Sequence, residues 1–150
     1  YLVAFSAGAG GLDPLLLRHA GDPRIAGVFA ADAYFGKAVK PGYMAHAKAV
    51  QATGSPFWIS TGWTGDRKTG NSGATSFPPF ADALGMTPTD PPSFMPPPVF
   101  AKSKGSVVWL RYDKPWTHQD HITKLAPKAL RAMLTGGTDA PATKQSASTY

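Results

Sequence analysis

Two residue types, cysteine and glutamate, are absent from the 150-residue chain. Without cysteine the protein forms neither disulfides nor thiolate metal sites, but a secreted enzyme need not contain cysteine, so the compartment stays open. Because all nine acidic residues are aspartates, an aspartate must supply any catalytic carboxylate. No apolar run approaches the roughly twenty residues of a membrane span, and no basic stretch before an apolar core marks an export signal. We therefore expect no membrane partner, and either a cytoplasmic or a secreted location.

Acidic residues are also few, and the fifteen lysines and arginines give the chain a net charge of +6. The basic residues are scattered, with no run denser than Lys102-Ser-Lys104. A nucleic-acid-binding face would concentrate them, so we expect a solvated basic surface and no nucleic-acid partner. The length and the 43% hydrophobic content suffice for one core. We expect one domain over residues 1–137 and a flexible polar tail over 138–150.

The start of the chain is an apolar run that ends abruptly at Ser6. The segment Leu2 to Phe5 is short and continuously apolar, which is typical of a strand buried on both faces of a parallel sheet. Apolar residues then recur at helical spacing over residues 12–19. A serine on so sharp a turn has strained backbone angles and needs small neighbours two positions away, and these are Ala4 and Gly8.

Strand and helix patterns alternate along the rest of the chain. Apolar segments predict strands over residues 25–31, 57–61 and 106–112, and helical patterns cover residues 43–52, 79–84 and 122–134. This alternation predicts an α/β fold with a mostly parallel sheet of about four strands and flanking helices.

Polar side chains of catalytic type follow each of these later strands. Asp32 comes directly after the second strand, and Asp66 lies in a glycine-rich loop, residues 62–73, after the third. His118 and His121 follow the fourth. Because the carboxyl ends of parallel strands share one sheet edge, we expect these side chains to converge near Ser6.

The pattern Ala4-x-Ser6-x-Gly8, followed in chain order by an aspartate and a histidine, resembles the α/β-hydrolase superfamily and its nucleophile elbow. Alanine replaces the first glycine of that motif. The resemblance implies a serine hydrolase of the esterase type that forms an acyl-enzyme with a small ester-like substrate and uses no cofactor. In that family Ser6 would be the nucleophile, and the backbone N–H of Ala7 would contribute to the oxyanion hole.

The resemblance leaves two members of the triad open. His121 opens the final helix in the segment His-Ile-Thr-Lys-Leu and is preferred as the base, with His118 as the alternate. Asp32 follows its strand immediately and is preferred as the acid over Asp66, which lies deeper in a glycine-rich loop.

The resemblance covers most of residues 1–137 but only the carboxyl-terminal half of the family fold. The second oxyanion donor of such enzymes comes from a loop in the other half. We therefore expect the missing amino-terminal half as a partner, in the same or another chain, and expect an exposed strand edge without it.

The sequence has three other interpretations. The alternative to an enzyme is a non-catalytic hydrolase-like scaffold that binds a partner through the proline-rich connector Met86 to Pro98. A phosphate-binding loop is disfavoured because Gly8-Ala-Gly10-Gly11 lacks the last glycine of its motif. A metal site is disfavoured because two histidines, three residues apart, leave a zinc ion short of ligands.

Overall fold

The computed structural model describes residues 1–34, 38–62 and 77–136. Six strands form one sheet in the order β1-β2-β3-β6-β5-β4. Four of them run parallel, namely β1 (Leu2–Phe5), β2 (Val28–Ala31), β3 (Phe57–Gly62) and β6 (Val107–Tyr112). The last two, β5 (Phe100–Lys104) and β4 (Thr87–Pro88), are antiparallel to their neighbours.

The α/β class is confirmed, but the sheet is mixed and has six strands, where the prediction was a mostly parallel sheet of about four. The added strands reach the sheet through a tight hairpin. β5 turns into β6 at Gly105, whose φ of +55° lies in the left-handed region that glycine adopts without strain. The alternating lysines of β5 hide its strand pattern, because its apolar residues are few.

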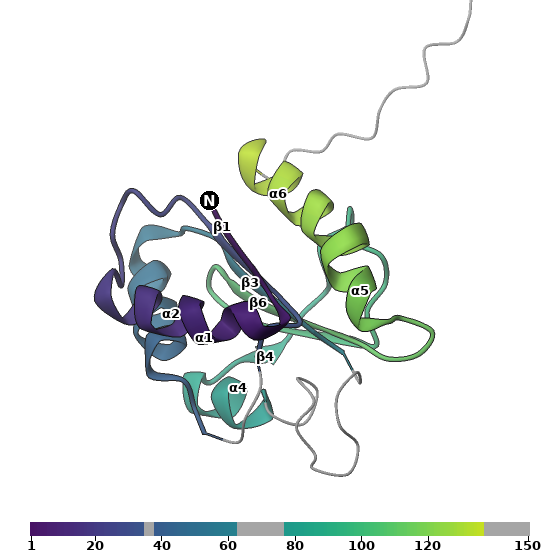
Figure 1. Cartoon of the computed structure of the whole chain (residues 1–150), viewed down its shortest axis with the longest axis horizontal. Coiled ribbons are helices and arrows are strands. Elements are labelled where there is room, and N and C mark those ends of the chain that lie inside the picture. The colour runs from purple at the N-terminus through teal and green to yellow at the C-terminus, as the bar shows by residue number, and fades with distance from the viewer. Residues whose placement is uncertain (35–37, 63–76, 137–150) are drawn as a thin grey trace, which may run out of the picture.

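Helices cover both faces of the sheet (Figure 1). On one face lie α1 (Ala9–Arg18), α2 (Pro41–Thr53) and α4 (Pro78–Leu84). On the other lie the single turn α5 (His118–Asp120), the π-helical turn η2 (His121–Leu125) and α6 (Ala126–Leu134). None of the helices in the described ranges is long and apolar enough to cross a membrane.

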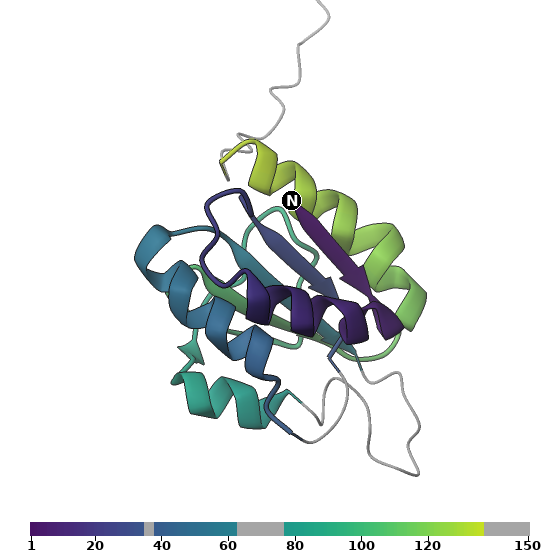
Figure 2. The ribbon, with the colours of Figure 1, turned by 60° about the vertical axis from the view of Figure 1, so that its left-hand side comes forward.

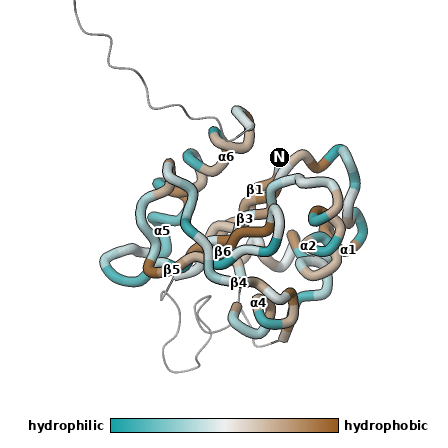
Figure 3. The backbone as a smooth tube through the Cα atoms, turned by 180° about the vertical axis from the view of Figure 1, so that it is seen from behind, coloured by the Kyte–Doolittle hydropathy of each residue, from teal (hydrophilic) through white to brown (hydrophobic). Residues whose placement is uncertain are grey.

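The two faces of the sheet bury separate apolar cores. Leu16 of α1 and Tyr43 of α2 pack on one face, and Leu125 and Ala129 pack on the other. Seen from behind in Figure 3, brown stretches, which mark hydrophobic residues, run along the strands of the sheet. The turned view in Figure 2 shows β1 at the outer edge of the sheet, beside α1.

The proline-rich connector between α4 and β5 packs against the sheet. Met95 is buried in the second core, and Phe94 stacks on Trp58 with ring centroids 5.5 Å apart. The Tyr112 hydroxyl donates to the carbonyl of Pro96 at 2.9 Å. These contacts turn the aromatic part of the connector inward, so less of it is exposed for a partner. The predicted tail over residues 138–150 lies outside the described residues.

Candidate active site

Ser6 lies where β1 ends and the 3-10 turn η1 (Ser6–Gly8) begins. Its φ of +53° is in the left-handed region, which side chains other than glycine rarely adopt. Gly8 faces Ala4 across the turn, and a Cβ added to Gly8 would lie 3.6 Å from the Ala4 Cβ. The backbone strain and small neighbours expected of the turn are therefore both present. Ala7 follows the serine within η1.

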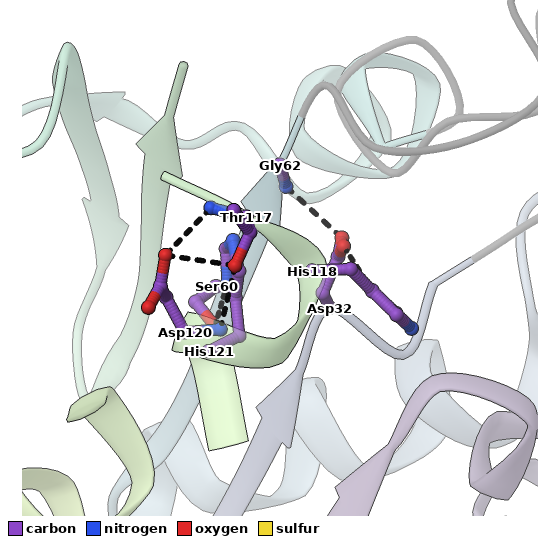
Figure 4. A network of polar contacts seen from close by, with 7 residues as sticks. All are labelled: Asp32, Ser60, Gly62, Thr117, His118, Asp120 and His121. Atoms are coloured by element: carbon purple, nitrogen blue, oxygen red, sulfur yellow. Dashed lines mark hydrogen bonds and ion pairs between the residues drawn. The ribbon is translucent and has the colours of Figure 1, made fainter. Parts of the chain in front are cut away.

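Asp32 lies at the end of β2, next to Ser6 in the sheet, because Phe5 and Ala31 are paired in register. The carboxylate is fully buried, and the backbone φ of Asp32 is +42°. Its Oδ1 accepts the N–H of Gly62 at the end of β3, at 2.9 Å. Its Oδ2 lies 2.6 Å from the Nδ1 of His118. Two fixed contacts therefore orient this carboxylate, as Figure 4 shows.

His118 is the first residue of α5, and its side chain remains 32% exposed. Its ring stacks on the ring of Phe5, with centroids 4.5 Å apart and planes 29° apart. Because Phe5 immediately precedes Ser6, this stacking places the imidazole beside the serine turn. A carboxylate only accepts hydrogen bonds, so the Nδ1 facing Asp32 carries the proton.

The turn that carries His118 is held by a capping box. The Thr117 hydroxyl accepts the N–H of Asp120, and the Asp120 carboxylate accepts the N–H of Thr117 at 2.8 Å. Hydrogen bonds from Lys124 and from Thr117 lower the pKa of Asp120 to about 2. Asp120 is thus a capping residue and is ionised at neutral pH. The other aspartate near the histidines, Asp113, forms an ion pair with Arg111.

His121, the preferred base of the sequence prediction, occupies a different environment. Its side chain is fully buried, its Nδ1 lies 2.9 Å from the Ser60 Oγ, and its ring lies nearly perpendicular to that of Tyr112. Its Nε2 has no hydrogen-bond partner within the described residues. Burial lowers the pKa of His121, which opposes the pull of Asp32 toward the charged form. The histidine in contact with Asp32 is therefore the alternate, His118.

Within the described residues, the buried His46 lies apart from this cluster, against Phe57 at the start of β3. Asp66 falls outside the described residues. Both ring nitrogens of the buried His46 lack a partner within the described residues, and burial lowers its pKa. Nowhere in the described part of the chain do three histidine or aspartate side chains gather as a metal ion would require.

Two contributors to the site were missed by the sequence prediction. Gly62 donates its backbone N–H to the acid, and Phe5 provides the surface on which the histidine stacks. Both roles follow from strand register, because each residue ends a strand beside the one that carries Asp32. Aligning the carboxyl ends of the predicted parallel strands would have identified both residues as neighbours of Asp32.

The comparisons with known proteins add no assignment to this geometry. No protein-family model, curated protein or solved structure matches the chain.

Proposed function

We propose that the chain carries the nucleophile, acid and base of a serine hydrolase of the esterase type, with Ser6, Asp32 and His118 in these roles. The observation that carries the proposal is the 2.6 Å contact between the Asp32 carboxylate and the His118 Nδ1. It occurs beside a serine in a strained strand-to-helix turn. Nucleophile, base and orienting acid are the three groups that acyl transfer by a serine requires.

The chemistry assigned to these groups proceeds in two halves. The Nε2 of His118 takes the Ser6 proton while Oγ attacks the acyl carbon, whose carbonyl oxygen becomes an oxyanion. In a turn of this kind the backbone N–H of the residue after the serine, here Ala7, donates to that oxygen. His118 then protonates the departing alkoxide, which leaves an acyl-serine. Water, deprotonated by the same imidazole, attacks the acyl-serine, and collapse of that intermediate restores Ser6 and releases the acid.

Asp32 is suited to orient the base because it is buried and both of its carboxylate oxygens have a partner. Its bond from Gly62 fixes one oxygen, so the other is held toward His118. The carboxylate keeps the imidazole proton on Nδ1 and stabilises the imidazolium that forms during proton transfer. His121 has no hydrogen bond to a carboxylate within the described residues. We assign it a structural role, in which its Nδ1 contacts the Ser60 hydroxyl.

We also propose that the parallel part of the sheet corresponds to the carboxyl-terminal half of an α/β-hydrolase fold. The support is the order of the strand ends, with serine after β1, aspartate after β2 and histidine after β6. The proposal includes an amino-terminal half as partner and source of the second oxyanion donor. The scaffold alternative has less support, because Phe94 and Met95 of the connector pack inward.

Reaction with a fluorophosphonate probe tests the proposed nucleophile. The probe is expected to label Ser6 when the chain is folded together with its amino-terminal half, as located by peptide mass spectrometry. Ser6→Ala should lose the label, whereas the matched variant Ser103→Ala, on β5, should keep it. A folded, full-length protein that takes up no label, or takes it up at another serine, contradicts the proposal.

The choice of base has its own test. His118→Gln is expected to slow both labelling and p-nitrophenyl acetate hydrolysis by about 10³-fold or more, because the serine loses its proton acceptor. His121→Gln should lose less than about tenfold per folded molecule. The opposite ranking would return the base to His121.

A further inference from the structure

A small cavity lies between the end of α2 and the loop that precedes β2. Its volume is about 130 Å³, and its walls include Ile25 from the loop and His46 and Val50 from the helix, so we call it the His46 cavity. These walls lie near the amino ends of β2 and β3, whereas Ser6 and Asp32 follow the carboxyl ends of their strands. The cavity is therefore separate from the proposed catalytic site.

His46 forms part of the buried wall of this cavity. The residue is 1% exposed, and neither Nδ1 nor Nε2 of its ring has a hydrogen-bond partner within the described residues. The ring packs against Phe57, with centroids 5.3 Å apart. A buried polar group that lacks a partner costs free energy and calls for an explanation. At this wall, a molecule bound in the cavity can supply the partner.

The charge state of His46 determines which partner suits it. Burial lowers the pKa of His46, so the ring is neutral at neutral pH. In a neutral imidazole one nitrogen donates a hydrogen bond and the other accepts one. A hydroxyl group can do both, so it can pair with either nitrogen.

The one charged residue among the described residues that line the cavity already has a partner. This residue is Asp22, whose carboxylate accepts from the Arg24 guanidinium at 3.0 Å and 2.6 Å. These hydrogen bonds hold the pKa of Asp22 well below its usual range. Because the charges of Asp22 and Arg24 balance, a charged ligand would lose water without gaining a free counter-charge. The cavity therefore favours an uncharged ligand.

The size and the walls of the cavity limit the ligand further. An apolar cavity of roughly 150 Å³ holds benzene, so the cavity beside His46 has about the size of one six-membered ring. Pro23, Ile25 and Val50 give it apolar surface. The loop is held close to α2 at Gly21, where φ is +72° and an added Cβ would lie 3.1 Å from the Ala49 Cβ. The space is thus preformed, as is usual for small-molecule sites.

We propose that the His46 cavity binds a small uncharged molecule made of one apolar ring that bears a hydroxyl group, and that this hydroxyl bonds to the His46 imidazole. The ring of the ligand contacts Ile25 and Val50. The other hydroxyl groups of the cavity wall already have a contact, because the Thr53 hydroxyl lies 3.2 Å from that of Ser55. The imidazole is therefore the polar group that selects the ligand.

The test is a titration of the folded, full-length protein with phenol and with toluene. Toluene is the matched control, because a methyl group replaces the hydroxyl on the same ring. NMR of isotope-labelled histidine follows the ring nitrogens of His46, which His46→Phe assigns by their loss. Phenol is expected to bind with a Kd of about 1 mM or below and to shift one of these nitrogens. Toluene should bind about tenfold or more weaker, since it leaves the imidazole without a partner.

Variants separate the hydrogen bond from the space, with binding followed by the backbone amide shifts of the cavity residues. His46→Phe keeps a ring against Phe57 but removes both nitrogens, so phenol should bind about tenfold or more weaker while toluene binding stays unchanged. Val50→Phe, and Thr53→Phe at the exposed rim, occupy the space and should weaken both ligands about tenfold. Val39→Phe, which lies outside the cavity, should bind like the parent. Circular dichroism checks that each variant is folded.

Three results would overturn the proposal. The first is the absence of a saturable shift at His46 up to about 50 mM phenol, which is fifty times the expected Kd. The second is toluene binding that equals or exceeds phenol binding in the parent. The third is phenol binding that His46→Phe, or both space-filling variants, leave unchanged. None of these measurements depends on turnover, so Ser6→Ala is expected to bind phenol normally, and failure here leaves the proposed hydrolase function standing.

Discussion

Replacement of Asp32 by asparagine is the sharpest perturbation of the proposed chemistry. The amide has nearly the size of the carboxylate, and its oxygen can still accept the N–H of Gly62. Its NH₂ group then faces the Nδ1 of His118, where Oδ2 stood at 2.6 Å. Two donors cannot share that contact, so the imidazole proton moves to Nε2. An Nε2 that already carries a proton cannot take one from Ser6.

The size of the effect follows from this change of tautomer. In the serine-protease template the same substitution lowers turnover by about 10⁴-fold, or about 5.4 kcal/mol of transition-state stabilisation. The stability cost is smaller, because exchanging one charge-assisted hydrogen bond is worth about 1.5–3 kcal/mol. Asp32→Asn should therefore fold but turn over very slowly.

Hydrolysis of p-nitrophenyl acetate measures the loss, with turnover expressed per folded molecule. Two aspartate controls are matched in chemistry: Asp66→Asn, in the segment outside the described residues, and Asp120→Asn, in the capping box. Each should lose less than about tenfold, since neither is assigned to orient the base. If Asp32→Asn keeps more than a tenth of the parent turnover, or if Asp66→Asn loses more, Asp32 is not the orienting acid.

Three further predictions concern stability. Gly42→Ala should lower the free energy of unfolding by about 1–3 kcal/mol, because an added Cβ would overlap the carbonyl oxygen of Asp13. Gly11→Ala, which has open space around it, should be neutral or stabilising in the same urea unfolding measurement. Thr117→Ala should lower the free energy of unfolding by about 1 kcal/mol, because it removes the cap of α5. It should also lower turnover modestly, because that turn carries the proposed base. Unchanged turnover would contradict a role of Thr117 in positioning His118. Burial lowers the pKa of His46, so the free energy of unfolding should be fully present above about pH 6.5 and decline as pH falls below it, since the unfolded chain then binds the extra proton. Urea unfolding of His46→Phe should show a shallower decline, and an equal decline would assign the effect to other groups.

The part of the site closest to the strands could be predicted from sequence. Short apolar runs bounded by turn residues located β1 and β2, and parallel pairing then makes Ser6 and Asp32 neighbours. Both residues have strained backbone angles. The sequence predicts this strain at Ser6, whose small flanking residues signal a sharp turn, but not at Asp32. Nothing in the local sequence of Asp32 signals its positive φ.

The choice between two nearby histidines could not be made in the same way. His118 and His121 lie on successive turns, and their directions depend on the capping box that starts α5 and on the π-helical turn that follows. A π turn holds an extra residue and changes which side chains share a face. The hairpin of β5 was missed for a different reason, since Lys102 and Lys104 give it the composition of a surface loop.

The register of the parallel strands also decides where this chain can change in length. Phe5, Ala31, Ser60 and Leu110 form one row across β1, β2, β3 and β6, and the proposed nucleophile and acid each follow that row by one residue. One residue inserted within β1 or β2 would move the proposed nucleophile or acid at its end out of this alignment. It would also turn the side chains on one side of the insertion to the opposite face of the sheet. A residue added to the loop between α1 and β2 leaves the row intact, and each doubling of a flexible loop costs only about 0.6 kcal/mol. The spacing along the chain between the proposed nucleophile and acid is therefore free to vary among descendants of this sequence, while their spacing across the sheet is fixed.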